Sequence, residues 1–578
     1  MQANRNNSET PAWTRVEMLA GIGLSLWVLL LHALFLFHAG PLWRDEVGTI
    51  DFAAMPTLSE LWHNLQYDNF PPLFVGVARV WMLAGWSGDF SCRLLGFFIG
   101  AGTLGVFWFG ASVGGARVPL LALALYAANP LAVRVGDAMR PYGLGFALNL
   151  LALALTWRFV ENPRARSWFW ATLAAVLSVQ CLYQNAFFLA AFCLSGCAVT
   201  LARIFLISAG SCHTMIGGAA LPRRPESGRS SSFALPDHEI SRLARRQWKT
   251  AGQTVGIGVV AALSLLPYWG NIVKGRDWQG ICRHPVRLVE IGNALVQALN
   301  ASGPWLVWFW AALALLAIGT ALVLAVRCRA WQMVYFGSAM LAATLFYGVF
   351  LEKIGLQQRS WYFLILLAPV ALAVDVILAG LAAPAMRVGR AGLALLLAAS
   401  SIPAGYAAVQ VRQSNADLIA QALKENARPG DLILVSPWHY GVALQRYYTN
   451  HFDTVPPMAE LRIHRYDLLK KEMLADNPIG PLLEQARQTL RSGHVLWLAG
   501  NFEPPPPGQP QPLMPPYREE MALDVPAAYY VSNWMFQFTQ MVRSHSTSSA
   551  EVMLSVPGGG VINSLEDMAL LRFSGWKD

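Results

Sequence analysis

The sequence predicts an α-helical polytopic membrane protein with about eleven transmembrane helices and a soluble α/β domain at its C-terminal end. Composition is the first reason: 55% of the 578 residues are hydrophobic and only 13% are charged, with a mean hydropathy of +0.39. A water-soluble core cannot bury that much apolar surface, so a lipid bilayer is the expected solvent. The second reason is the order along the chain, because runs long enough to span a bilayer, roughly 17–25 residues, all lie before residue 411.

The first apolar run is expected to remain as a membrane anchor rather than be removed as a signal peptide. It is too long and too aromatic for a signal peptide, has no small-residue cleavage site, and is followed directly by the charged letters WRDE. The expected spans are residues 18–40, 93–113, 118–135, 142–160, 168–183, 186–208, 251–270, 303–326, 331–350, 361–382 and 389–410.

The stretch PPLFVGVARVWMLAGW, residues 71–86, is apolar but short, begins with two prolines and contains Arg79. If it spanned the bilayer, the basic loops that follow would fall on the outer side, against the positive-inside rule. We therefore expect a short amphipathic segment that lies at the membrane surface.

The same rule places the N-terminus in the cytoplasm, so that residues 1–410 form the membrane domain and residues 411–578 lie outside. The inner loops are basic and account for most of the net charge of +9. Residues 209–250, which include RLARRQWK, are expected to be a basic cytoplasmic linker that contacts anionic membrane lipids, not nucleic acid. We expect a multi-pass protein of the inner (plasma) membrane, with the outer domain in the periplasm or outside the cell. The inner arginines outside this linker are Arg117, Arg158, Arg164, Arg166, Arg327, Arg329, Arg387 and Arg390.

After residue 411 the pattern becomes that of a small α/β domain. NADLIAQALKENA, residues 415–427, has helical periodicity. LILVS at 432–436, HVLWLAG at 494–500 and VMLSV at 552–556 are predicted strands. FEPPPPGQPQPLMPPY, residues 502–517, is expected to be a proline-rich extended loop.

The first outer loop, residues 41–92, contains two acidic positions of interest. WRDEVGTID places Asp45 and Glu46 directly behind the first span, and Asp68 precedes a double proline in YDNFPPLF. Taken alone, Asp45 and Glu46 could simply mark the point where the first span leaves the bilayer, because acidic residues are common there. The two prolines stiffen the backbone at the membrane surface and favour a position of Asp68 near Asp45.

A basic cluster occurs at the outer end of the third span, in NPLAVRVGDAMRPYG. Arg134, Asp137 and Arg140 either form ion pairs that dock helices or form part of a site. In a site, an arginine holds a phosphate with two hydrogen bonds and a nearby carboxylate accepts a proton. Tyr142 follows at the start of the next span, where it either packs or contacts a substrate.

These motifs, in this order, resemble the polyprenol-dependent membrane glycosyltransferases of the GT-C fold. They are Asp-Glu in the first outer loop, Asp-x-x-Pro-Pro-Leu some twenty residues later, Arg-Leu opening a span and Arg-Pro-Tyr closing the next. The class includes protein O-mannosyltransferases and the aminoarabinose transferase that acts on lipid A, which are similar to glycosyltransferase family 39. The resemblance covers residues 41–160 well and is weaker over QQRSWYFLILLAPVALA, residues 357–373.

The resemblance implies an inverting transfer of a sugar from a polyprenyl-phosphate donor to a glycan, lipid or protein acceptor on the outer face. Asp45 matches the general base of the family, and Glu46 would position the acceptor or raise the proton affinity of Asp45. Asp68 matches the second acidic position near the donor head group. Arg140 and Arg359 would stabilise the departing phosphate, with Asp137 and Tyr142 as further substrate contacts.

One position departs from the pattern, because relatives often have His or Lys directly before Pro-Pro where this chain has Phe70. A phenyl ring neither binds a metal nor donates to a phosphate, so donor contacts at this point must differ. A divalent cation, Mg²⁺ or Mn²⁺, remains an open expectation, with Asp45 and Asp68 as its ligands if one is bound.

A transporter or flippase of lipid-linked glycan intermediates is the alternative function. Such a protein would carry buried charges or broken helices near the bilayer midplane, often in inverted repeats. Here the unusual charges lie at the outer edge and no repeat is visible, which favours the enzyme.

Overall fold

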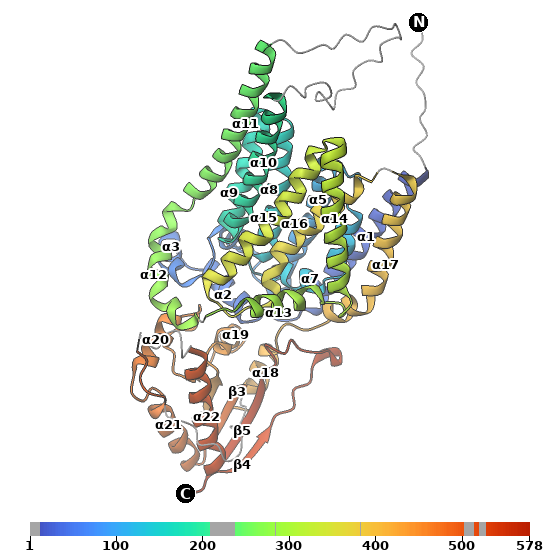
Figure 1. Ribbon diagram of the computed structural model, residues 1–578. Coiled ribbons are helices and arrows are strands. Elements are labelled where there is room, and N and C mark those ends of the chain that lie inside the picture. Colours follow the sequence, from blue (N-terminus) through green and yellow to red (C-terminus); the bar gives the residue numbers. More distant parts are fainter. Residues whose placement is uncertain (1–11, 209–236, 284, 382, 502–513, 519–526) are drawn as a thin grey trace, which may run out of the picture.

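A bundle of long helices carries a small α/β domain at one end (Figure 1). The structure is a computed structural model, and it describes residues 12–208, 237–283, 285–381, 383–501, 514–518 and 527–578. The first helix begins at the end of the bundle that is far from the α/β domain (Figure 1). The predicted class, an α-helical polytopic membrane protein with a C-terminal α/β domain, is confirmed.

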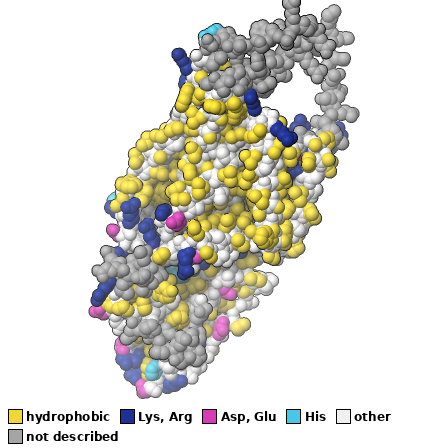
Figure 2. Space-filling model, viewed as in Figure 1, with side chains coloured by type: hydrophobic (Ala, Val, Ile, Leu, Met, Phe, Trp, Pro, Cys, Tyr) yellow, Lys and Arg dark blue, Asp and Glu magenta, His cyan; other side chains and the backbone are white. Residues whose placement is uncertain are grey.

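Nine helices among the described residues are long and apolar enough to cross a bilayer. They are α1 (Ala12–His38), α5 (Asp89–Val113), α8 (Tyr142–Glu161), α10 (Asn185–Ser208), α11 (Asp237–Leu263), α14 (Leu306–Cys328), α15 (Trp331–Ile354), α16 (Leu364–Ala379) and α17 (Pro384–Val409). Hydrophobic side chains cover the visible face of the bundle, whereas charged ones gather at its two ends and on the α/β domain (Figure 2).

The remaining two expected spans take a different form. Residues 168–183 correspond to α9 (Ala165–Cys181), a helix of 17 residues. Residues 118–135 do not form one helix as predicted, because the chain breaks into α6 (Leu120–Ala127) and α7 (Pro130–Gly136). Pro130 has no backbone N–H to donate into a continuing helix, and Asn129 before it has a non-helical ψ of 89°.

Short helices cover the end of the bundle that faces the α/β domain: α2 (Arg44–Ala53), α3 (Leu58–Asn64), α4 (Leu73–Leu83), α12 (Trp269–Gln279) and α13 (Leu288–Leu299). Helix α4 contains the stretch expected not to span, and its 11 residues are too few to cross a bilayer. Arg79 of α4 donates to the carbonyls of Ala53 (2.8 Å) and Met55 (2.5 Å), where α2 ends. The arginine therefore fixes α4 to the C-terminal end of α2.

The basic linker expected over 209–250 is wrong in part, because α11 begins at Asp237 and the letters RLARRQWK are helical. These polar turns extend α11 beyond the apolar part of the helix. Residues 209–236 lie outside the described residues.

The α/β domain has a five-stranded mixed sheet in the order β2-β1-β3-β5-β4. Strands β1 (Leu432–Ser436), β2 (Asp453–Thr454) and β3 (Val495–Gly500) are parallel, and β4 (Ser546–Glu551) and β5 (Ala569–Trp576) add antiparallel pairs. Its helices are α18 (Ala416–Asn426), α19 (Tyr440–Tyr447), α20 (Tyr466–Leu474), α21 (Gly480–Arg491) and α22 (Ala527–His545).

Two of the three predicted strands, β1 and β3, form the buried centre of this sheet. The strand predicted at VMLSV is wrong: β4 ends at Glu551, just before it, and the next strand is β5. Most of the proline-rich loop, residues 502–513, lies outside the described residues.

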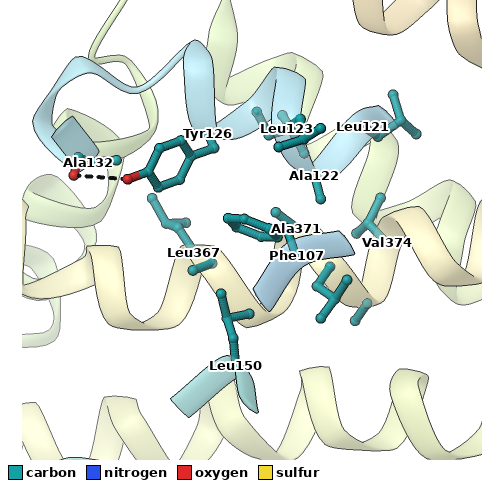
Figure 3. Packing of buried hydrophobic residues seen from close by; sticks show 14 of the residues in the cluster. Phe107, Leu121, Ala122, Leu123, Tyr126, Ala132, Leu150, Leu367, Ala371 and Val374 are labelled. Carbon is teal, nitrogen blue, oxygen red and sulfur yellow. Dashed lines mark hydrogen bonds between the residues drawn. The ribbon is translucent and has the colours of Figure 1, made fainter. Parts of the chain in front are cut away.

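The two largest hydrophobic clusters of the described residues fill the bundle and join it to the α/β domain. One fills the bundle around α6, and Figure 3 shows Phe107 of α5, Leu150 of α8 and Leu367 of α16 within it. The other joins the bundle to the α/β domain, because Val47 of α2 and Trp438 beside α19 belong to one buried cluster. The α/β domain is thus docked on the segment of residues 41–92.

Candidate functional site

A cavity of about 290 Å³ lies between one end of the bundle and the α/β domain. Charged, aromatic and apolar side chains share its lining, and they come from both parts of the molecule. The lining residues are Asp45, Tyr67, Asp68, Asn69, Phe70, Arg140, Tyr142, Tyr183, Gln184, Phe350, Leu351, Ile354, Leu356, Trp361, Tyr362, His464 and Tyr466.

Asp45 lies in the first turn of α2, where the helix N-terminus favours a negative charge. Its carboxylate faces three basic side chains, the nearest atoms being 3.8 Å away in Arg140, 3.6 Å in His464 and 3.9 Å in Arg44. Burial raises the pKa of Asp45, but the charges around it, led by Arg140, outweigh burial and bring this pKa below its usual range. Asp45 is therefore an anion at neutral pH.

Arg140 is held by contacts on several sides. Its Nη1 donates to the carbonyl of Asp45 (3.2 Å) and to the hydroxyl of Thr49 (3.1 Å). The guanidinium carbon lies 4.8 Å from the ring centre of Phe70, which in turn meets Tyr142 edge to face at 5.5 Å. Phe70, the departure from the family pattern, thus supplies a cation–π contact that orients the arginine.

Asp68 lines the same cavity, and its environment differs from that of Asp45. Burial raises the pKa of Asp68, and the opposing effects of Arg140 and of the Asn69 and Phe70 amides are too small to restore it. The two carboxylates of the cavity therefore have proton affinities that are displaced in opposite directions, a pattern typical of acid–base sites.

Glu46 does not line the cavity, although it was expected to act beside Asp45. Its side chain is fully buried and forms an ion pair with Arg93 of α5. Glu46 also accepts hydrogen bonds from the amides of Trp43 (3.1 Å) and Met139 (2.9 Å). These contacts use both carboxylate oxygens and fix the start of α2 against two other segments.

Asp137 and Arg359, two expected substrate contacts, are also absent from the cavity lining. Both Asp137 oxygens lie 2.8 Å from Nδ1 of His32 in α1, and the pair is buried. Arg359 contacts Gln357 at 2.7 Å and the ring of Trp361 at 5.7 Å. In that segment Trp361 and Tyr362 line the cavity instead.

The α/β domain contributes His464 and Tyr466, which sequence reasoning missed. The two rings are stacked with centroids 6.2 Å apart, and Trp278 of α12 stacks on Tyr466 at 5.4 Å. Gly48 of α2 makes room for the imidazole, since a Cβ there would lie 3.2 Å from Nδ1. Burial lowers the pKa of His464 to about 4, so the ring is neutral at neutral pH. No local motif marks these residues, because only the docking of the domain brings them to Asp45.

Arg44 links this centre to a second buried carboxyl group, that of Glu566. Its Nη1 lies 3.0 Å from Oε1 of Glu566, whose side chain is fully buried in the α/β domain. The ring of Tyr440 packs under the guanidinium at 5.3 Å. Helix α2 and the segment before β5 are therefore joined directly behind Asp45.

The described residues do not fit a divalent cation held by the protein. They contain no group of three or more His, Cys, Asp or Glu side chains placed to bind one. The two expected ligands, Asp45 and Asp68, already share the positive charge of Arg140.

No protein-family model matches the chain, and no curated protein matches its sequence. Among solved structures, the chain is similar to ArnT from Cupriavidus metallidurans bound to undecaprenyl phosphate, with 12% identity, 85% of this chain and 93% of that chain covered, and a TM-score of 0.46. It is also similar to the Archaeoglobus fulgidus oligosaccharyltransferase in the apo form, with 12% identity, 86% and 70% coverage, and a TM-score of 0.46. The same oligosaccharyltransferase tethered to an acceptor peptide matches at 10% identity, 96% and 74% coverage, and a TM-score of 0.45.

Proposed function

We propose that the chain is an inverting glycosyltransferase that moves a sugar from a polyprenyl-phosphate donor to an acceptor hydroxyl on the outer face of the membrane. The observation that carries the proposal is the convergence of Asp45, Asp68 and Arg140 on one cavity at the end of a transmembrane bundle. A cation between two carboxylates suits a substrate with an anionic leaving group and a proton to lose.

The cavity also has an apolar wall, formed by Phe350, Leu351 and Ile354 at the end of α15 and by Leu356 beyond it. Such a wall suits a donor whose phosphate lies at the membrane surface while its polyprenyl chain stays in lipid. In this proposal the counter-charge for the phosphate is the guanidinium of Arg140, held in place by Phe70 and Thr49.

The reaction is a displacement at the anomeric carbon. The acceptor oxygen attacks that carbon, the bond from the carbon to the phosphate oxygen breaks, and the bonding electrons leave with the polyprenyl phosphate. Arg140 stabilises the growing negative charge on the phosphate. Attack on the face opposite the phosphate inverts the configuration of the sugar.

Asp68 and Asp45 have different roles in the proposed reaction. Asp68 is the better proton acceptor, because burial raises its pKa, so it takes the proton of the acceptor hydroxyl. Asp45 stays ionised and stabilises the positive charge that develops on the sugar ring. The neutral side chains of His464 and Tyr466 line the part of the cavity where the acceptor binds. This assignment moves the base role from Asp45, where the family resemblance places it, to Asp68.

The orientation is part of the proposal. The arginine-rich ends of α8, α9 and α14 lie away from the α/β domain (Figure 1). The positive-inside rule therefore puts the N-terminus in the cytoplasm and the cavity on the outer side of the plasma membrane.

The test is transfer of radiolabelled sugar from a panel of polyprenyl-phosphate sugars by membranes that contain equal amounts of folded protein. We expect Asp45→Asn and Arg140→Ala each to reduce transfer by roughly 10²–10³-fold. Asp51→Asn is the matched control, because Asp51 lies on the same helix but does not line the cavity, and it should leave transfer near the wild-type rate.

Wild-type rates in Asp45→Asn and Arg140→Ala would contradict the proposed roles. Absence of transfer with every donor, together with protein-dependent movement of labelled lipid-linked sugar across vesicles, would instead establish the transporter.

A further inference from the structure

A second cavity lies at the opposite end of the bundle, far from the proposed catalytic site. It has a volume of about 240 Å³ and is lined by Leu155 and Arg158 of α8 and by Arg164, Arg166, Ser167 and Trp170 at the start of α9. Three of its six lining residues are arginines, and no acidic residue is among them.

The three arginines have no carboxylate to neutralise them among the described residues. No described acidic side chain forms an ion pair with Arg158, Arg164 or Arg166, and the nearby Glu161 pairs with Arg203 at 2.8 Å. Arg158 has one ring contact, to Phe109, with 6.0 Å between the guanidinium and the ring centre. Concentrated, uncompensated positive charge around a hollow is the arrangement that binds a phosphate group.

The position of the cavity indicates where that phosphate comes from. Its arginines lie where α8 ends and α9 begins, whereas Leu155 and Trp170 lie further along the two helices, on the bilayer side. Trp170 is 45% exposed and its neighbour Phe169 is 54% exposed, as expected for aromatic side chains at the membrane interface. The lining thus changes from cationic to apolar along the direction in which a phospholipid changes from head group to acyl chain.

We propose that this cavity binds the head group of an anionic phospholipid from the leaflet on the side of the bundle away from the α/β domain. The phosphate contacts the three guanidinium groups, the Ser167 hydroxyl donates to the glycerol phosphate oxygens, and the acyl chains run along Leu155 and Trp170. The cavity volume of about 240 Å³ is enough for a glycerol phosphate group. The inference does not depend on the proposed enzymatic function.

The test uses the full chain in a neutral detergent, with phosphatidylglycerol titrated in and bound lipid counted by native mass spectrometry. The triple variant Arg158→Gln, Arg164→Gln and Arg166→Gln should bind phosphatidylglycerol more weakly by on the order of 100-fold, because each arginine near a lipid phosphate contributes about fivefold.

The matched control removes the same charge elsewhere. Arg15, Arg327 and Arg387 belong to the same end of the bundle but do not line this cavity, and their triple change to Gln should alter the affinity less than about threefold. A triple change of the cavity arginines to Lys keeps the charge and reports on folding, and it should bind phosphatidylglycerol more tightly than the Gln variant does.

Equal weakening in the cavity variant and in the control would overturn the proposal, because it would show general attraction of charge rather than a site. Equal binding of phosphatidylcholine would do the same. Displacement of phosphatidylglycerol by inorganic phosphate at a similar concentration would show a site for free phosphate and would refute the assignment to a lipid.

Discussion

The buried ion pair between Glu46 and Arg93 gives a prediction that separates a structural from a catalytic role for Glu46. Only 2% of the Arg93 side chain and none of the Glu46 side chain is exposed. The change Arg93→Met keeps a long apolar side chain over Phe35, which the guanidinium now covers at 5.7 Å, but leaves the carboxylate of Glu46 without its counter-charge.

Removal of one partner of a buried ion pair costs about 3–5 kcal/mol in unfolding free energy. Glu46 keeps its hydrogen bonds from Trp43 and Met139 after the change. We therefore expect the lower end, about 3 kcal/mol, which lowers the unfolding midpoint by several degrees or more. The double variant Glu46→Gln with Arg93→Met should recover part of this loss, because no buried charge is left unpaired.

The assay is thermal unfolding of the purified chain in detergent, followed by intrinsic tryptophan fluorescence. Arg203→Met is the control, since it breaks an ion pair of 2.8 Å whose Glu161 side chain is 46% exposed, and such pairs contribute at most about 1 kcal/mol. Equal midpoints for Arg93→Met and Arg203→Met would refute the structural role. So would a double variant that is less stable than Arg93→Met alone.

Three further predictions concern the cavity and its surroundings. Gly48→Ala should reduce sugar transfer several-fold at nearly unchanged stability, because its Cβ would displace the His464 imidazole by a few tenths of an ångström. Gly23→Ala is the control and should leave transfer unchanged, since no atom lies within 4 Å of the new Cβ. Burial raises the pKa of Glu566 to about 8, so the folded state holds a proton that the unfolded state releases, and the unfolding free energy should fall as pH rises from about 4.5 to 8. Glu566→Gln should flatten this dependence, and parallel curves for the two proteins would contradict the reasoning. Transfer should decline as pH falls through the raised pKa of Asp68, and a pH profile of the residual activity of Asp68→Asn should lack that decline.

The helices and strands that could be predicted are those whose hydrophobic pattern lies within a short stretch of sequence. The apolar length of α1 and α16, and the short buried runs of β1 and β3, each carry enough information within a few residues. The break between α6 and α7 was also readable in principle, since Pro130 stands inside the predicted span.

Only the site residues that lie in residues 41–92 or just before the span that begins at Tyr142 could be predicted from the sequence. Asp45, Asp68 and Arg140 meet as their spacing and order suggested. The distinct environments of Asp45 and Glu46, adjacent in sequence, follow from helical rotation, which turns one toward the cavity and the other toward Arg93. His464 was not predictable, because its place beside Asp45 depends on how the α/β domain packs against Gly48.

The link between Arg44 and Glu566 has a consequence for how the protein is made. Residues that meet behind Asp45 are separated by more than five hundred positions. A ribosome that has finished the membrane bundle has therefore produced a chain whose cavity still lacks His464 and whose Arg44 still lacks Glu566. The cavity and the contact behind it are completed only after residue 566 has been synthesised and has reached the same side of the membrane as Arg44.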